Sequence, residues 1–265
     1  GRVGLGKQMF CITPESLSEQ LPYQNSNNGL IITGDIRLDN REQLVAAFPG
    51  VNKSIPDSLL VLKAYEKWGL QVVDHLIGNY AIAIWDSLKQ KLMLITDHIG
   101  IKPIFYYQTQ TQFIFASDIK AILAIDSIPK QLNKSLLATY TLLPSAPYLL
   151  PESTFFKNIF AMTAATIMTV HSQGINKQRY WRVDSNKRIE FKGEEDWIES
   201  FQEIFFKAVN SCMRSNFPIV SLLSGGLDSS SIAATAATIL EKQNKSLHTL
   251  SAVLPDNYKG TGVDE

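Results

Sequence analysis

The sequence predicts an α+β domain over residues 1–183, followed by the beginning of an α/β domain over residues 184–265. Strands of period two that are joined by hairpins, with helical segments beside them, indicate the first domain. An apolar strand, a glycine loop, a helix and another strand, in that order, indicate the second, since this is the start of a parallel β-loop-α-β unit. The 265 residues are enough for both domains.

The strands of the first domain are predicted from apolar alternation and turn residues. Residues 29–38 predict a strand with a glycine break at Gly34. Further strands are expected at 79–85, 92–95, 104–107, 113–115 and 165–170.

Two helices of the first domain have start and stop signals. Asn40 predicts the cap of a short helix that leads into residues 44–48. A clearer helix is predicted from Asp57, as its cap, to Trp68, and Gly69 ends it. In the second domain we expect a helix over 194–213, a strand over 219–223, a helix over 229–242 and a strand over 247–254.

Composition and charge exclude several classes of partner. Hydrophobic residues make up 45% and charged residues 19%, and 25 Lys+Arg balance 25 Asp+Glu. We therefore expect no nucleic-acid partner. No apolar run approaches the roughly 18–20 residues that span a bilayer, so we expect no membrane association. Two distant cysteines, Cys11 and Cys212, rule out a disulfide framework and favour a cytoplasmic location.

The chemistry is expected in the loop between the strand and the helix of the second domain. It consists of Ser224, Gly225, Gly226, Leu227, Asp228, Ser229 and Ser230. The glycines permit positive φ and close approach, and successive amides at a helix start bind phosphate. No lysine follows, so this is not a Walker-type loop. Asp228 would repel phosphate unless it binds Mg²⁺ or caps the helix, and we favour Mg²⁺. The alternative interpretation is a tight turn in which the glycines serve packing and the serines cap.

Residues 222–230 resemble the ATP loop of asparagine synthase and its relatives. The resemblance implies an ATP-pyrophosphatase (adenine nucleotide α-hydrolase-like) domain that adenylates a carboxylate, releases pyrophosphate and lets an amine attack. It implies ATP contacts at Leu222, Ser224, Gly225, Gly226, Leu227, Asp228, Ser229, Ser230 and Ala252. Asp264 and Glu265 resemble the acidic pair that opens the next helix.

Five stretches of the first domain, residues 57–58, 64–69, 78–86, 97–103 and 115–121, resemble landmarks of the family's glutamine amidotransferase domain. This resemblance implies an N-terminal-nucleophile-hydrolase-like sandwich. It implies glutamine contacts at Gly34, Asp35 and Asp57, although Asp57 is equally interpreted as a plain helix cap.

Three departures from the family pattern concern the glutamine site. Residue 1 is Gly where the family nucleophile is an N-terminal Cys, and Cys11 is interpreted as a buried thiol, so no catalytic residue is assigned. Met9 stands where the family carries an arginine for the glutamine carboxylate, and Thr33 replaces an asparagine. We expect residues 1–265 to be an internal piece of a longer enzyme, inactive alone, without the N-terminal part of the first domain and most of the second.

Three hypotheses of function follow from the resemblance. The first is a glutamine-dependent, AMP-forming amide ligase of asparagine synthase type, which uses ATP, Mg²⁺, glutamine and a carboxylate such as aspartate. The second is a ring-closing ligase like lasso-peptide cyclases or β-lactam synthetases, with an inactive glutaminase domain and, for the cyclases, a precursor peptide as substrate. Residues 13–16 and 37–41 resemble that branch. The third is a non-catalytic scaffold. A homo-oligomer is compatible with all three.

Overall fold

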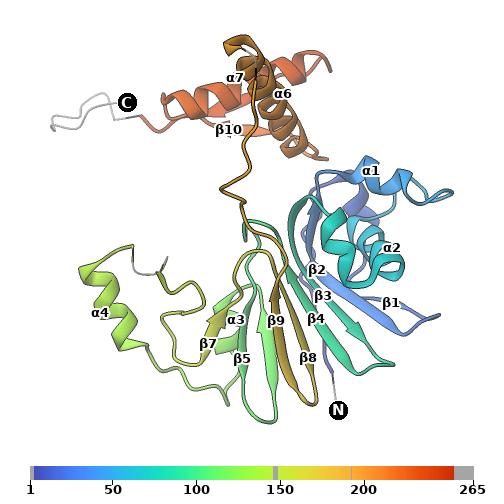
Figure 1. The fold of residues 1–265 in the computed structure, drawn as a ribbon, viewed down its shortest axis with the longest axis vertical. Coiled ribbons are helices and arrows are strands. Elements are labelled where there is room, and N and C mark those ends of the chain that lie inside the picture. The colour runs from blue at the N-terminus through green and yellow to red at the C-terminus, as the bar shows by residue number, and fades with distance from the viewer. Residues whose placement is uncertain (1–2, 146–148, 192, 254–265) are drawn as a thin grey trace. The chain divides into compact units, whose positions relative to one another are not determined.

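The computed structural model describes residues 3–145, 149–191 and 193–253, so Asp264 and Glu265 lie outside the described residues (Figure 1). The chain divides into two compact units. The first comprises Gly1–Phe10 with Ser18–Asp184, and the second comprises Cys11–Leu17 with Ser185–Glu265. Within the described ranges, no helix is both long enough and apolar enough to cross a membrane.

The first unit contains a six-stranded antiparallel sheet in the order β1-β2-β3-β4-β8-β9. Its strands are β1 (Tyr23–Asn25), β2 (Leu30–Leu38), β3 (Gly78–Asp86), β4 (Lys91–Thr96), β8 (Thr166–His171) and β9 (Gly174–Arg179). The predicted strands are confirmed, but the predicted break at Gly34 is wrong, because β2 continues through it. A Cβ at this position would lie 2.4 Å from the carbonyl oxygen of Ala81. Gly34 therefore allows β2 to approach β3 closely.

A second, three-stranded sheet has the order β6-β5-β7, and its strands are β5 (Phe105–Gln108), β6 (Phe113–Ala116) and β7 (Ile159–Ala161). The hairpin of β5 and β6 was predicted, whereas β7 was not. The helices of this unit are α1 (Arg41–Ala46), α2 (Asp57–Trp68), α3 (Ile119–Leu123) and α4 (Lys134–Leu142), and a 3₁₀ helix, η2, spans Gly69–His75. Another 3₁₀ helix, η1, spans Pro14–Ser18, and its residues up to Leu17 belong to the second unit.

The predicted helix 57–68 has the bounds that the sequence indicates, but its cap differs. Gly69, with a φ of 57°, ends the helix as expected. Pro56, not Asp57, occupies the cap position, and no side chain caps the helix. Interpreting Asp57 as a plain cap is therefore wrong, because its carboxylate bonds elsewhere. Asn40 is at the predicted cap position of α1, yet its side-chain oxygen accepts the amide of Ile77 over 2.9 Å instead of capping the helix.

Three apolar clusters make this unit a layered sandwich (Figure 1). One face of the large sheet, including Ile32, Tyr80 and Ile82, packs with side chains of α2 and η2. Its other face packs against β5 and β6 through residues such as Ala83 and Tyr106. A third cluster joins α3 to the outer face of the small sheet. The order helix–sheet–sheet–helix confirms the predicted N-terminal-nucleophile-hydrolase-like sandwich.

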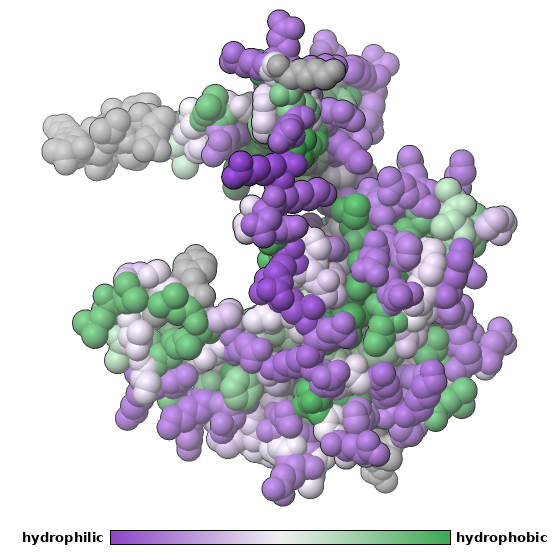
Figure 2. Space-filling view, in the orientation of Figure 1, coloured by the Kyte–Doolittle hydropathy of each residue, from purple (hydrophilic) through white to green (hydrophobic). Residues whose placement is uncertain are grey.

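The segment around α4 leaves large apolar side chains exposed. Leu136 is the buried residue of α4. The exposed apolar residues here are Leu132, Tyr140, Leu142, Leu143, Leu149 and Leu150. Figure 2 shows a green patch on the segment that contains α4.

The second unit contains α6 (Glu194–Cys212), β10 (Val220–Leu222), α7 (Leu227–Glu241) and β11 (His248–Leu250). β10 and β11 are parallel, which confirms the predicted β-loop-α-β unit. Val209 of α6 packs against Ala236 and Ile239 of α7. Cys11 is part-exposed in an irregular segment, so the expectation of a buried thiol in a strand is wrong.

Candidate functional site

The glycine loop connects the end of β10 directly to the first turn of α7. α7 begins at Leu227, two residues before the predicted start, so Asp228 belongs to the helix and not to the loop. Gly225 has a φ of 82°, which lies in the left-handed region. Gly226 has a φ of −70°, so the expected positive φ is confirmed for Gly225 and wrong for Gly226. One glycine makes the turn, and the other occupies the cap position of the helix.

Two serine hydroxyls hold the loop in this conformation. The Oγ of Ser224 lies 3.0 Å from the Oγ of Ser229. The amide of Ser224 donates to Ser229 Oγ over 3.3 Å, and Ser229 Oγ donates to the carbonyl of Gly226 over 3.1 Å. These bonds close a ring across the turn, so the loop is held in place without a ligand.

The remaining amides of the loop are open. Ser230 makes the first helical bond of α7, to the carbonyl of Gly226. The amides of Gly225, Leu227 and Asp228 make no hydrogen bond to any residue in the described ranges. The side chains of Leu222 and Leu227 are 78% and 82% exposed, so solvent reaches the loop from both sides. Donors at an exposed helix N-terminus attract an anion, because the helix dipole adds to their partial charges.

The parallel register brings Ala252 to the same sheet edge as the loop. Leu222 pairs with Leu250, and the amide of Leu223 donates to the carbonyl of Leu250 over 2.9 Å. Ala252, two residues beyond Leu250, is exposed at the carboxyl end of β11. In α/β sheets ligands bind at this edge. All nine residues predicted to contact ATP therefore lie around one edge.

A cavity of about 420 Å³ lies between the two sheets of the first unit. Its polar lining residues include Lys7, Thr33, Gly34, Asp35 and Ser117. Its apolar walls include Ala81, Ala83, Ile104, Phe113 and Phe115. Gly34 and Asp35, two of the three predicted glutamine contacts, thus lie at one cavity. Lys102 Nζ lies 2.8 Å from Asp35 Oδ2 at its edge.

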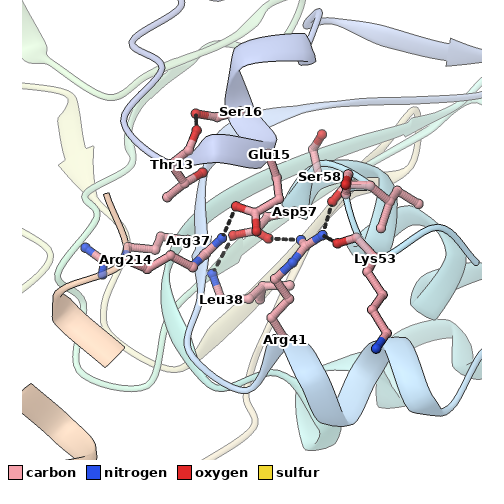
Figure 3. Close-up of polar contacts among 12 residues, drawn as sticks. Thr13, Glu15, Ser16, Arg37, Leu38, Arg41, Lys53, Asp57, Ser58 and Arg214 are labelled. Carbon is pink, nitrogen blue, oxygen red and sulfur yellow. Dashed lines mark hydrogen bonds and ion pairs between the residues drawn. The ribbon is translucent and has the colours of Figure 1, made fainter. Parts of the chain in front are cut away.

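Asp57, the third predicted glutamine contact, does not line this cavity. It is buried, and Arg41 Nη1 donates to its Oδ1 over 2.5 Å (Figure 3). Its Oδ2 accepts the amide of Leu38 over 2.9 Å. Arg41 also donates to the carbonyls of Lys53 and Ile55. Asp57 therefore joins β2, α1 and α2.

Sequence reasoning missed Lys7 and undervalued Thr33. Thr33 is 4% exposed, and its Oγ1 has no hydrogen-bond partner among the described residues. Period-two alternation in β2 is the signal that finds it, because Ile32 faces the helices and Thr33 faces the other sheet. No local signal marks Lys7, which lies in an irregular segment.

The described part of the chain contains no group of three or more His, Cys, Asp and Glu side chains that could hold a metal ion. Asp228 is exposed in the first turn of α7. Its role as a Mg²⁺ ligand stays a prediction.

Family comparisons agree with the sandwich and the loop. Residues 1–181 match the model of the glutamine amidotransferase domain, and residues 200–265 match that of asparagine synthase. These matches place the chain in the family that joins a glutamine amidotransferase domain to an asparagine synthase domain.

Individual relatives are much longer than this chain. Asparagine synthetase [glutamine-hydrolyzing] 3 of Bacillus subtilis is 36% identical over 77% of this chain and 33% of its own length. Asparagine synthetase [glutamine-hydrolyzing] 2 of the same organism is 31% identical over 97% of this chain and 35% of its own length. The chain thus spans about a third of these relatives. Among solved structures, glutamine phosphoribosylpyrophosphate amidotransferase of B. subtilis is 12% identical, with a TM-score of 0.40 over 90% of this chain and 49% of that one.

Proposed function

We propose that the chain is part of an ATP-dependent, AMP-forming amide ligase of asparagine synthase type that takes its nitrogen from glutamine. The second unit would activate a carboxylate, such as that of aspartate, and the first would bind glutamine. The family matches of both units and the names of the relatives support this proposal. We further propose a domain boundary after residue 183 and a cytoplasmic location. We also propose small molecules, not nucleic acid or membrane, as partners.

The observation that carries the proposal is the open loop at the start of α7. Three of its amides are unbonded within the described residues, and Gly225 has no side chain to obstruct a ligand. This donor set fits a diphosphate, which offers several anionic oxygens to amides and hydroxyls. The residues present therefore fit ATP.

Each loop residue has a role in this proposal. The amides of Gly225, Leu227 and Asp228 would bind the leaving pyrophosphate, with the hydroxyls of Ser229 and Ser230 beside them. Asp228 would hold Mg²⁺ against the phosphates, since its carboxylate is exposed next to those amides. Leu222 and Ala252 would contact the nucleotide at the sheet edge. ATP, when bound, supplies the adenylyl group that activates the carboxylate.

The contacts of Asp57 favour a second candidate, a ring-closing ligase whose amine is already part of the substrate. Both oxygens of Asp57 accept protein donors away from the cavity. An amino acid in the cavity would therefore not contact Asp57, one of the carboxylates that the resemblance implies for glutamine binding. In this candidate the loop keeps its role, and the first unit hydrolyses no glutamine.

The test of the proposed function is ATP–pyrophosphate exchange by the complete protein that contains this chain. Asp228→Ala should reduce the exchange rate at least about a hundredfold, or about 2.7 kcal/mol in the activation free energy. Glu241→Ala, at the exposed opposite end of α7, is the matched control and should leave the rate unchanged. Equal rates for the two variants would refute the role of Asp228, and absent exchange in the unmodified protein would refute the adenylating function.

A further inference from the structure

We propose that the second unit binds a small organic carboxylate with an apolar body in a second cavity, at the edge of its sheet opposite the glycine loop. This cavity has a volume of about 640 Å³. Small-molecule sites in proteins have volumes of roughly 300–1,000 Å³, so the cavity has the size of a ligand site. The inference is independent of the proposed function, because the residues that line the cavity include none of the glycine loop.

The second cavity lies where α6 and α7 end and where β10 and β11 begin. Ile219 directly precedes β10, and His248 is the first residue of β11. Leu240 lies in the last turn of α7, and Met213 directly follows α6. The glycine loop is at the other end of α7, which has 15 residues and is therefore roughly 20 Å long. A molecule in this cavity would thus not occupy the place proposed for the nucleotide.

One wall of the second cavity comes from a segment that is distant in sequence. Pro14 lines the cavity and belongs to the N-terminal segment of the second unit. The amide of Asn216 donates to the carbonyl of Ile12 over 2.8 Å. Arg214 Nη1 lies 2.7 Å from Glu15 Oε2, and these side chains are only 21% and 16% exposed. The contacts hold this wall in place without a ligand.

The lining of the second cavity carries positive but no negative charge. No Asp or Glu is among the described residues that line it. Arg214 is paired with Glu15, whereas Lys245 forms no ion pair within the described ranges. Six polar side chains line the cavity without a hydrogen bond to any other described residue, namely Asn210, Asn216, Gln243, Lys245, Ser246 and His248. A carboxylate is suited to a lysine and several neutral donors, because charge-assisted hydrogen bonds are the stronger ones.

The helix ends at the second cavity do not favour a cation instead. The C-terminus of a helix attracts cations through its unsatisfied carbonyls. Here the carbonyl of Leu240 accepts the amides of Gln243 and Lys245, over 2.8 and 3.0 Å. The carbonyl of Asn210 accepts the amide of Met213 over 3.0 Å. These carbonyls are therefore already bonded within the chain.

Apolar side chains exclude a simple inorganic anion as the best ligand. Met213, Phe217 and Ile219 line the second cavity together with the polar groups. Phe217 is 54% exposed, so a ligand that covers its ring removes apolar surface from water. An aromatic or aliphatic body attached to the carboxylate gains this contribution, whereas acetate or phosphate does not.

Fluorine NMR titrations of the complete protein with para-fluorophenylacetate and its neutral counterpart para-fluorophenylacetamide test this inference. The carboxylate should bind about tenfold more tightly than the amide. Lys245→Met should weaken the carboxylate about three- to tenfold and leave the amide unchanged, whereas Phe217→Ala should weaken both probes by a similar factor. Lys207→Met is the charge-matched control, since Lys207 is exposed on α6 and does not line the cavity. Lys245 and Phe217 are exposed, so both variants should keep the urea unfolding midpoint of the unmodified protein.

The outcomes separate the location of the site from its preference for an anion. Equal affinities for the two probes, or equal losses of both in Lys245→Met, overturn the preference for a carboxylate. Absent binding, or a loss in Lys207→Met as large as that in Lys245→Met, overturns the site itself. Carboxylate binding that depends on Lys245 and Phe217 supports the inference even if the protein shows no ATP–pyrophosphate exchange and the adenylating function fails.

Discussion

The hydroxyl of Tyr80 lies 3.0 Å from the hydroxyl of Tyr180, which is 100 residues further along the chain. Tyr180 also donates to the carbonyl of Thr96 over 2.8 Å, so Tyr80 is the donor in the tyrosine pair. Burial raises the pKa of Tyr180 to about 12 and raises the pKa of Tyr80 as well. Both hydroxyls therefore keep their protons at neutral pH, and the pair joins β3 to the residue that follows β9.

This chain of bonds predicts unequal effects of two conservative substitutions. Tyr180→Phe leaves the hydroxyl of Tyr80 and the carbonyl of Thr96 without partners, so it should lower the free energy of unfolding by about 1–3 kcal/mol. Tyr80→Phe leaves no buried donor without an acceptor, so it should lower the free energy of unfolding less, by about 1 kcal/mol. Urea unfolding midpoints at constant m-value measure both. Equal midpoints for the two variants would contradict the assigned donor direction.

The Arg41–Asp57 pair predicts a large loss of stability when one partner is removed. Arg41→Leu removes the cation that pairs with the buried carboxylate of Asp57 and should lower the free energy of unfolding by about 3–5 kcal/mol. Lys89→Ala is the control, since Lys89 also pairs with an aspartate, at 3.4 Å, but is 75% exposed. Its effect should stay below about 1 kcal/mol. Urea unfolding that gives similar losses for both variants would rule out a structural role for Arg41.

We expect the two glycines of the loop to differ in how well they tolerate replacement by alanine. Gly225→Ala forces a β-carbon into the left-handed region, which disfavours the observed loop by about 1–2 kcal/mol. Gly226→Ala adds a Cβ 3.5 Å from Ser224 Oγ, an ordinary contact, at a φ that alanine adopts easily. ATP affinity of the complete protein, measured by calorimetry, should therefore fall more in Gly225→Ala. The reverse order would mean that the observed loop is not the one that binds nucleotide.

We expect His98 to titrate below the ordinary histidine pKa of 6.5. Its ring is 5.3 Å from the rings of Tyr180 and Trp181, and burial lowers its pKa below the ordinary value of 6.5 against the smaller raising effects of Asp97 and Asp74. Trp181→Ala should raise the pKa of His98 towards 6.5, because it hydrates the ring. Imidazole NMR titration measures both values, with His98→Gln to assign the signal. A midpoint above 6.5 in the unmodified protein would contradict the burial argument.

The same lowered pKa fixes the sign of its effect on stability. The unfolded chain binds a proton at His98 more readily than the folded chain, so this contribution to stability is present above pH 6.5 and is lost as the pH falls through the folded pKa. Urea unfolding below pH 6.5 should therefore depend less steeply on pH in His98→Gln. An unchanged pH dependence would show that other groups dominate.

The helices and strands that were predicted correctly are those whose sequence signals lie within one short segment. The helix over 57–68 and the parallel strands beside α7 have the expected positions, because an apolar stripe and the glycines lie within one short segment. The position of the glycine loop between β10 and α7 was predictable for the same reason. β7 was missed because its pairing with β5 joins Tyr106 to Phe160, far apart in the sequence. α4 was missed because its apolar run lacks a helical period, and most of that run is exposed.

The cavity was predictable only in part. Gly34 and Asp35 could be predicted because they belong to a short sequence motif. The position of Lys7 at the cavity depends instead on how an irregular segment packs. The pairing of Asp57 with Arg41 also depends on tertiary structure, since Arg41 lies 16 residues away in another helix. Sequence motifs identify residue types, but they do not reveal which charges the folded chain has already neutralised.

The alternation along β2 separates side chains that pack against the helices from side chains that line the cavity. Ile32 belongs to the layer under the helices, whereas Thr33 and Asp35 face the cavity. Point substitutions at these two positions can thus change the lining of the cavity while the hydrophobic layer stays intact. A single-residue insertion in the strand would exchange the two sets of side chains, so homologous lineages should diverge here by replacement and not by changes in strand length.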